Sequence, residues 1–429
     1  MIGDGMDVTE REEPRDAHAA DPPAEPGFDD RVPALDGVRG FALIFTLLFH
    51  FSFMAGVPRD ALLDRVVKQI TDATWFGMDL FFVLSGFLIT GILYDAKVAG
   101  GANYFRNFYA RRGLRIFPAH YALLIFMFLV FPLVQPMEKA AIAAIRHDWE
   151  WNVTYLANVR IALDHGRRAD IFVMGHVWSL SVEEQFYIVW PFVVFLLNRQ
   201  KLIVACCIAI FAAMLMRVGM TTAGVNTWYP YLLSPARMDS LAIGSLIAIA
   251  ARDPRDIQLV KRYLPPAALA AAAFIAVLSV AHGEFDIFAP WSRMFGHTSL
   301  AIVWGMLVFT AATGSRHLWV NRALEHRILT TLGTYSYAMY LVHLPIAYVL
   351  YHRTDVSGVV PPTFGSYLGA ELFFMFVAFV PTFIIGALSW HLYEKQVLKL
   401  KRFFPYAKRA RSDKRIRQSA KIAGALGTD

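Results

Sequence analysis

The chain has 429 residues, of which 56% are hydrophobic and 17% are charged, and its formal net charge is +7. This composition excludes an ordinary soluble domain, because repeated apolar runs of about 20 residues are typical of a helical protein that crosses a membrane several times. The two cysteines, Cys206 and Cys207, are adjacent in an apolar run. We therefore expect inert thiols and no disulfide framework.

Apolar runs alternate with short polar segments from residue 33 onward and predict an all-α, polytopic transmembrane helix bundle. We expect about ten spans, at 34–57, 73–94, 116–136, 176–197, 202–219, 229–250, 264–281, 293–314, 330–351 and 366–390. Residues 1–32 are acidic, rich in proline and without an apolar face, which is typical of a disordered tail. The chain therefore divides into this tail, a transmembrane domain at 33–395 and a basic tail at 396–429.

Basic residues follow alternate loops, which predicts the orientation of the spans. Arg199 and Lys201 lie in one loop and Arg255 and Lys261 in another, whereas 220–228 and 282–292 hold no lysine or arginine. By the positive-inside rule, we expect both termini in the cytoplasm. The outside loop at 137–175 is long, carries both signs and is a candidate cover over a site. The basic tail either binds anionic headgroups or enforces this topology.

The first span, VRGFALIFTLLFHF, begins with an arginine and holds a histidine deep inside. Arg39 and His50 are eleven residues apart, which is close to three helical turns, so both lie on one face and about 16 Å apart along the axis. His50 is then near the middle of a hydrocarbon core about 30 Å thick. A histidine there is a functional candidate, and the alternative is a hydrogen bond to a neighbouring helix.

A second polar stripe occurs in HVWSLSVEEQFYIVWP, which enters the membrane from the outside. His176, Ser179, Glu183 and Tyr187 have the spacing i, i+3, i+7 and i+11 and therefore share one face. Glu183 lies about 10 Å into the span, at a depth comparable to that of His50. A carboxylate beside an imidazole would fix its tautomer, which suits a general base. The alternative is a structural pair that holds two helices together.

A basic cluster occurs in FYARRGLRIFPAHY, where Arg111, Arg112 and Arg115 share one side of a helix at the cytoplasmic boundary. Arginine forks favour phosphate groups. A plain positive-inside anchor for the third span is the alternative interpretation.

More polar residues interrupt the apolar spans, and together they indicate a polar chamber within the bundle. Each one alone is equally consistent with a hydrogen bond between helices. They are Asp79, Arg237 and Asp239, and also Ser336, Tyr340 and His343, whose spacing i, i+4 and i+7 places them in a stripe on one face of a helix.

These motifs resemble acyltransferase family 3, the integral-membrane O-acyltransferases of bacteria. The resemblance rests on Arg39 with His50, then on DLFFVLSGFLIT, RRGLRIFP, HVWSLSVEEQFY, ARMDSLAIG and SYAMYLVH in this order. It covers roughly residues 33–395. Longer members carry an esterase-like extracytoplasmic domain after the spans, and we expect none here.

The resemblance implies a transfer reaction in the bacterial cytoplasmic (inner) membrane. An acyl group, with acetyl the expected one, moves from cytoplasmic acyl-CoA to a hydroxyl of an extracytoplasmic or membrane-embedded acceptor, expected to be a glycan. His50 is then the expected general base, and Glu183 is expected to orient it. Arg39 is expected to line the entry path of CoA.

The same resemblance assigns the other candidates. Arg111, Arg112 and Arg115 are expected to bind acyl-CoA, which is a co-substrate, and we expect no permanently bound cofactor or metal. The donor to the oxyanion is left open between Arg237, Tyr340 and His343. The wider set of substrate or oxyanion candidates is Asp79, Ser179, Tyr187, Arg237, Asp239, Ser336, Tyr340 and His343.

Two other classes of protein remain as alternatives. A proton-coupled secondary transporter of an anionic solute or lipid would use the same buried histidine, glutamate and arginines as a relay. A scaffold anchored to anionic lipid would explain the basic tail but not the polar stripes. Beside the bilayer, the expected partners are acyl-CoA and the acceptor, with no nucleic acid, and the oligomeric state is left open.

Overall fold

A computed structural model describes residues 32–101, 103–134, 143, 146–167, 171–283, 285–314 and 317–406. Within these ranges the chain is helical and contains no β-strand, which confirms the predicted all-α class. Residues 1–31 and 407–429, which hold most of the two predicted tails, lie outside the described residues.

The long helices follow one another along the chain with few long connections. They are α1 (Pro33–Met54), α2 (Leu62–Ala73), α3 (Gly77–Val98), α4 (Tyr104–Ile125), α10 (Val177–Leu196), α11 (Arg199–Thr222), α13 (Ser234–Ala250), α14 (Pro254–His282), α15 (His297–Thr313), α17 (Arg327–Arg353) and α19 (Leu368–Leu388).

Short helices and turns connect or extend them. The short α-helices are α5 (Phe131–Val134), α7 (Trp149–Val153), α8 (Ala157–Leu163), α9 (Ile171–Met174), α12 (Trp228–Leu232), α16 (Trp319–Leu324), α18 (Val356–Val359) and α20 (Lys395–Leu398). The 3₁₀ segments are η1 (Thr74–Phe76) and η5 (Lys399–Phe403), and the π-helical segments are η2 (Phe126–Val130), η3 (Ser292–Gly296) and η4 (Ser389–Glu394).

Eight helical stretches of the described residues are long and apolar enough to cross a membrane, so this is a multi-pass membrane protein. They are Pro33–Met54, Leu62–Val98, Tyr104–Leu133, Arg199–Thr222, Trp228–Ala250, Pro254–His282, Ser292–Thr313 and Leu368–Phe403. The two remaining predicted spans fall on α10 and α17, which carry polar stripes. With 20 and 27 residues, these helices are about 30 and about 40 Å long.

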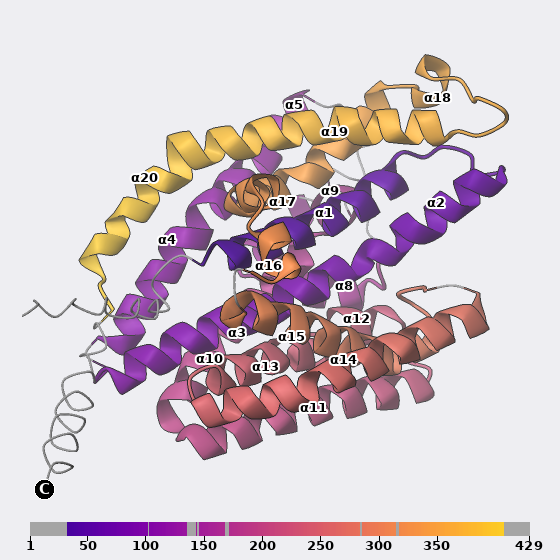
Figure 1. The fold of residues 1–429 in the computed structure, drawn as a ribbon. Helices are drawn as coiled ribbons and strands as arrows, with labels where there is room; N and C mark the ends of the chain where they lie inside the picture. The colour runs from indigo at the N-terminus through magenta and orange to yellow at the C-terminus, as the bar shows by residue number, and fades with distance from the viewer. Residues whose placement is uncertain are drawn as a thin grey trace, which may run out of the picture. The chain divides into compact units, whose positions relative to one another are not determined.

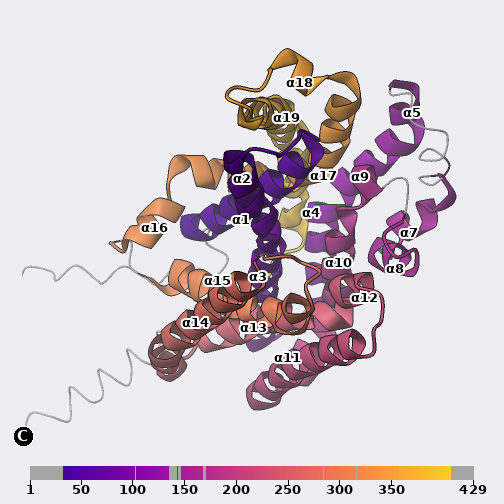
Figure 2. The same cartoon turned by 90° about the vertical axis from the view of Figure 1, so that its right-hand side faces the viewer.

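The helices form two groups on either side of α3. Figure 1 shows α11, α13, α14 and α15 together on one side, and α17 and α19 on the other side of α1. The same grouping is visible in Figure 2. The contacts agree, because α3 packs against α13 and α15 and also against α1 and α10. The space between α1, α3, α10 and α17 is therefore enclosed by helices.

Glycines bring α1 and α17 into very close contact. A Cβ atom added at Gly40 would lie 2.1 Å from the Leu329 carbonyl oxygen, and one added at Gly333 would lie 1.8 Å from the Asp36 carbonyl oxygen. Both obstacles are backbone atoms of the facing helix, so only glycine permits this approach. The contact sets the distance between the predicted polar faces of the two helices.

We expect Gly333→Ala to separate α1 from α17. Because the new methyl group meets a backbone oxygen, the free energy of unfolding should fall by about 1–3 kcal/mol, which thermal unfolding in detergent would measure. Gly219→Ala on α11 is the matched control, since nothing lies within 4 Å of its added Cβ. An equal effect of the two substitutions would mean that the α1–α17 contact is not specially tight.

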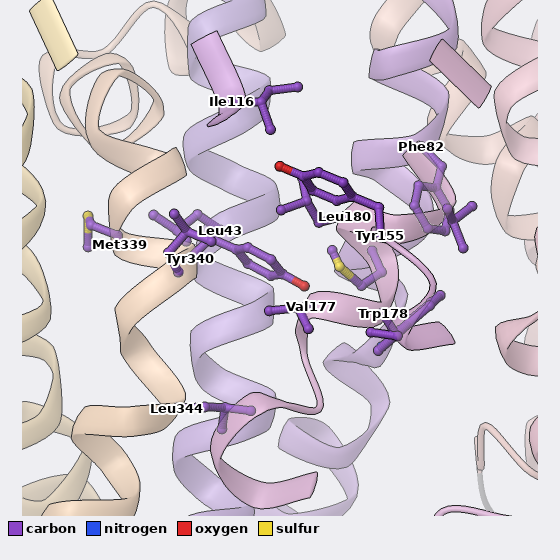
Figure 3. Packing of buried hydrophobic residues seen from close by; sticks show 14 of the residues in the cluster. Leu43, Phe82, Ile116, Tyr155, Val177, Trp178, Leu180, Met339, Tyr340 and Leu344 are labelled. Atoms are coloured by element: carbon purple, nitrogen blue, oxygen red, sulfur yellow. The ribbon is translucent and has the colours of Figure 1, made fainter. Parts of the chain in front are cut away.

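Buried side chains from four helices fill the space around this contact. Figure 3 shows Leu43 of α1, Phe82 of α3, Val177 of α10 and Met339 of α17 among them. All four are fully or almost fully buried. Such close packing fixes the height of each polar residue relative to those on neighbouring helices.

Candidate active site

A cavity of about 120 Å³ lies between α1, α3, α4, α10 and α17, and we call it the central cavity. Apolar side chains such as Phe81, Phe82 and Leu84 form part of its wall. Eight of the residues singled out from the sequence also line it: Arg39, Arg112, Arg115, Ser179, Glu183, Tyr187, Ser336 and Tyr340. The structure thus brings the first span, the basic cluster and the α10 stripe to one place.

The arginines of the cavity wall have guanidinium N–H groups that make no hydrogen bond within the described part of the chain. Arg112 stacks over the Tyr187 ring at 4.7 Å, and Arg115 lies over the Trp390 ring at 5.8 Å. Neither guanidinium makes a hydrogen bond or ion pair with another described residue. Arg39 donates to Asp36 Oδ1 at 2.6 Å. Glu183 of the same wall is near Arg112, and Glu394 is near Arg115. The guanidinium N–H groups that make no hydrogen bond in this half-buried wall still suit an anionic ligand.

Arg111 is placed differently from its two neighbours. It is not part of the cavity wall. Its Nη1 lies 3.4 Å from the Phe404 carbonyl oxygen, and its guanidinium lies 4.5 Å from the centre of the Tyr406 ring. The predicted trio therefore divides into two residues that line the cavity and one that contacts the end of the described chain.

Glu183 does not form the predicted pair with His50. Its carboxylate accepts a hydrogen bond from Ser85 Oγ, and Ser85 is in turn 2.8 Å from the Tyr187 hydroxyl. The expected pairing is wrong because periodicity gives the depth of a residue in its own helix but not which side of a neighbouring helix it faces. Glu183 is instead a wall residue of the central cavity.

His50 is oriented by its own helix and by His343. Its Nδ1 lies 3.0 Å from the Thr46 carbonyl oxygen and 3.1 Å from His343 Nε2. His343 Nδ1 lies 2.6 Å from the Tyr340 carbonyl oxygen. Since a carbonyl only accepts, both Nδ1 atoms carry the proton when the rings are neutral. His50 Nε2 then presents its lone pair and has no partner among the described residues.

Tyr340 lies between the cavity and the histidines. Its hydroxyl donates to the His176 carbonyl oxygen at 2.6 Å and is 2.6 Å from Ser179 Oγ. In Figure 3 its ring projects from α17 toward Val177 at the start of α10. The rings of His176 and His343 lie next to the Tyr340 ring, and their centres are 4.9 Å apart. Tyr340 and Ser179 thus belong both to the inner end of the cavity and to the surroundings of the histidine pair.

A sequence model of an acyltransferase domain matches residues 32–391, which is most of the chain. The chain belongs to acyltransferase family 3. It is 26% identical over 387 residues to a peptidoglycan O-acetyltransferase of Listeria monocytogenes, covering 86% of this chain and 56% of that protein.

A second relative comes from Bacillus subtilis, where its name is "Putative peptidoglycan O-acetyltransferase YrhL". It is 27% identical over 380 residues, covering 85% of this chain and 55% of the relative. The chain thus spans about half the length of the curated relatives it matches. No solved structure matches the chain significantly.

Three of the polar candidates lie outside the cavity wall, in a fully buried cluster. Asp79 accepts from Arg237 Nη2 at 2.7 Å and contacts His297 Nδ1 at 3.2 Å. Asp239 accepts from Arg217 Nη2 at 2.7 Å. These pairs join α3, α11, α13 and α15, so the structure places Asp79, Arg237 and Asp239 where they hold helices together.

Sequence reasoning missed several of these residues. Ser85 is a single polar side chain within an apolar run, and Tyr337, which lines the cavity, stands between two residues of a predicted stripe. His297 and Arg217 lie in no motif. Among the described residues, no group of three histidine, cysteine, aspartate or glutamate side chains is placed to hold a metal ion.

Proposed function

We propose that this acyltransferase transfers an acetyl group from cytoplasmic acetyl-CoA to a hydroxyl group of a glycan outside the cytoplasm. It would do so in the bacterial cytoplasmic membrane, with about ten spans and both termini inside. One observation carries the proposal: α1 places Arg39 in the wall of a cavity that two further arginines line, and about 16 Å along the same helix it places a histidine with a free Nε2.

The arginines of the cavity wall support an acyl-CoA donor. Arg39, Arg112 and Arg115 belong to the cytoplasmic halves of the stretches Pro33–Met54 and Tyr104–Leu133 in the proposed topology, which is the side where CoA is found. The diphosphate of CoA is an anion that forked guanidinium donors bind well. The pantetheine arm would follow the apolar wall of α3 inward and bring the thioester to Ser179 and Tyr340.

The histidine pair supports direct transfer between the two substrates. His50 Nε2 takes the proton of the acceptor hydroxyl while the hydroxyl oxygen attacks the thioester carbonyl. The C–S bond then breaks, and the imidazolium returns the proton to the CoA sulfur. His343 is a positioning residue, because it accepts from His50 Nδ1–H and holds the ring. The Tyr340 hydroxyl or Ser179 Oγ would serve the oxyanion by exchanging their present partners.

Peptidoglycan is the acceptor to test first. The two relatives described above carry that polymer in their names. A sugar hydroxyl is a weak nucleophile at neutral pH, so it requires a base such as His50 within hydrogen-bond reach. The lack of a nucleophilic serine or cysteine motif in the sequence favours this direct route over an acyl-enzyme.

We expect Arg112→Gln and Arg115→Gln to weaken acetyl-CoA binding by about 10- to 100-fold each, because each removes charge-assisted hydrogen bonds to phosphate. Calorimetry on the purified protein would measure this. Arg106→Gln is the control, since Arg106 lies on the same helix but over the Phe404 ring, 5.9 Å from its centre, and outside the cavity wall. Unchanged affinity for acetyl-CoA in both cavity variants would mean that the donor does not bind in this cavity.

The proposal is tested by following free CoA released from acetyl-CoA by the purified protein. Release should require a peptidoglycan fragment with free hydroxyl groups and should leave one acetyl ester on the glycan for each CoA. Release of CoA at the same rate with and without the glycan would mean simple hydrolysis of the thioester. Binding of acetyl-CoA without any release, with several glycans offered, would count against an enzyme of this kind.

A further inference from the structure

The end of the described chain folds back onto the basic helix α4. We call residues 399–406 the C-terminal arm; it consists of η5 and the three residues that follow. Asn107 Nδ2 donates to the Pro405 carbonyl oxygen at 2.7 Å, and Arg111 contacts both Phe404 and Tyr406. Figure 1 shows the chain running from α19 through α20 toward α4. The arm therefore lies beside the basic stretch of α4 that carries Arg111.

Lys401 brings a further cation to this place. It is half-buried, and its ammonium group makes no hydrogen bond or ion pair with another described residue. Lys401 belongs to η5, which packs against α4, and α4 carries Arg111, Arg112 and Arg115. Arg39 is also close enough for its charge to act on the Lys401 ammonium group. Like charges gathered in this way repel one another, so the arrangement favours a ligand with several negative charges.

These basic residues fall into two sets by position, and each set can bind a different anionic part of one ligand. Arg39, Arg112 and Arg115 line the central cavity, whereas Arg111 and Lys401 do not. In CoA the diphosphate connects to the pantetheine arm, and the 3′-phosphate is carried by the ribose beyond it. A ligand with its thioester inside the cavity would thus present the diphosphate to the first set and the 3′-phosphate to the second.

We propose that the C-terminal arm and α4 form a subsite for the 3′-phosphate of CoA, in which the side chains of Lys401 and Arg111 bind the phosphate. This inference rests on the proposed acyl-CoA donor. It gives the arm a role in binding, beyond that of a topological anchor. It also predicts that the enzyme distinguishes CoA from its analogue without the 3′-phosphate.

The test compares acetyl-CoA with acetyl-3′-dephospho-CoA on the full-length protein in detergent, using dissociation constants from calorimetry. Wild type should bind acetyl-CoA about 10- to 100-fold more tightly than the dephospho analogue. Lys401→Ala should weaken the binding of acetyl-CoA by a similar factor and leave the dissociation constant of the dephospho analogue unchanged. Retained binding of the analogue shows that the variant is folded. Lys401→Arg should keep the preference.

Arg402→Ala is the matched control, because Arg402 is the next residue but is exposed and stacks on Phe403, 4.8 Å from the ring centre. It should change neither constant. Equal weakening of both ligands by Lys401→Ala, or weakening of neither, would overturn the subsite while leaving the donor proposal intact. Wild type that binds neither ligand would overturn the donor proposal and the subsite together.

Discussion

Replacing His50 with alanine should lower the rate of acetyl transfer by about 10²- to 10⁴-fold, which is the usual contribution of a general base. The reason is that His50 Nε2 is the free lone pair of a ring whose Nδ1–H is held by Thr46 and His343. The dissociation constant of acetyl-CoA should stay unchanged, because His50 does not line the central cavity. Steady-state release of CoA, together with calorimetry, measures both quantities.

His352→Ala is the control for the loss of an imidazole. His352 lies at the end of α17 and is exposed, and its ring is tilted against that of Tyr348 with the ring centres 4.3 Å apart. This variant should transfer acetyl groups at the wild-type rate. If His50→Ala kept more than about a tenth of that rate, which is well outside the range for a general base, His50 would be a structural residue and the mechanism would fail.

Removing the Asp79 carboxylate should destabilise the fold more than any other single change proposed here. Asp79→Ala leaves the Arg237 guanidinium buried without its counter-ion, since both side chains are 0% exposed. Breaking a buried pair in this way costs about 3–5 kcal/mol. Thermal unfolding of the purified protein in detergent should show the loss, and protein that remains folded should still bind acetyl-CoA.

Asp72→Ala is the control for this effect. Asp72 pairs with Lys68 on α2, and the two side chains are 34% and 49% exposed. A pair that water reaches on both sides contributes about 0–1 kcal/mol. Replacing both members of the buried pair, with Asp79→Leu and Arg237→Met, should recover most of the stability. Normal stability together with lost activity in Asp79→Ala would instead mark Asp79 as catalytic.

Periodicity within one helix predicted much of the site. The spacing of Arg39 and His50 indicated one face and a depth difference. In the structure Arg39 lines the cavity, and His50 contacts His343, which lies one turn along α17 from the cavity residue Tyr340. The stripe of Ser179, Glu183 and Tyr187 lines the same cavity. These predictions succeeded because a continuous helix fixes the angles between its own residues.

Contacts between helices were beyond the reach of periodicity. The partner of His50 is His343, more than 290 residues away, and Glu183 pairs with Ser85 instead. Both outcomes depend on how far one helix is rotated and shifted against its neighbour. Glycine contacts such as that of Gly333 with Asp36 set this shift, and no pattern within a single span encodes it.

The sequence could not predict where the C-terminal arm packs, for a similar reason. Its basic residues resemble any cytoplasmic flank under the positive-inside rule. Only the fold shows that Pro405 and Tyr406 pack on α4 beside Arg111. The buried cluster around Asp79 likewise needed the fold, because three other helices supply its partners.

The most direct test uses sealed vesicles that contain the purified protein. Acetyl-CoA labelled in its acetyl group is supplied outside, and peptidoglycan fragments are enclosed inside. We predict labelled acetyl esters on the enclosed glycan, one free CoA outside for each ester, and neither product with His50→Ala. Label that crosses as acetate or as intact acetyl-CoA, without esters on the glycan, would contradict the account and indicate a transporter.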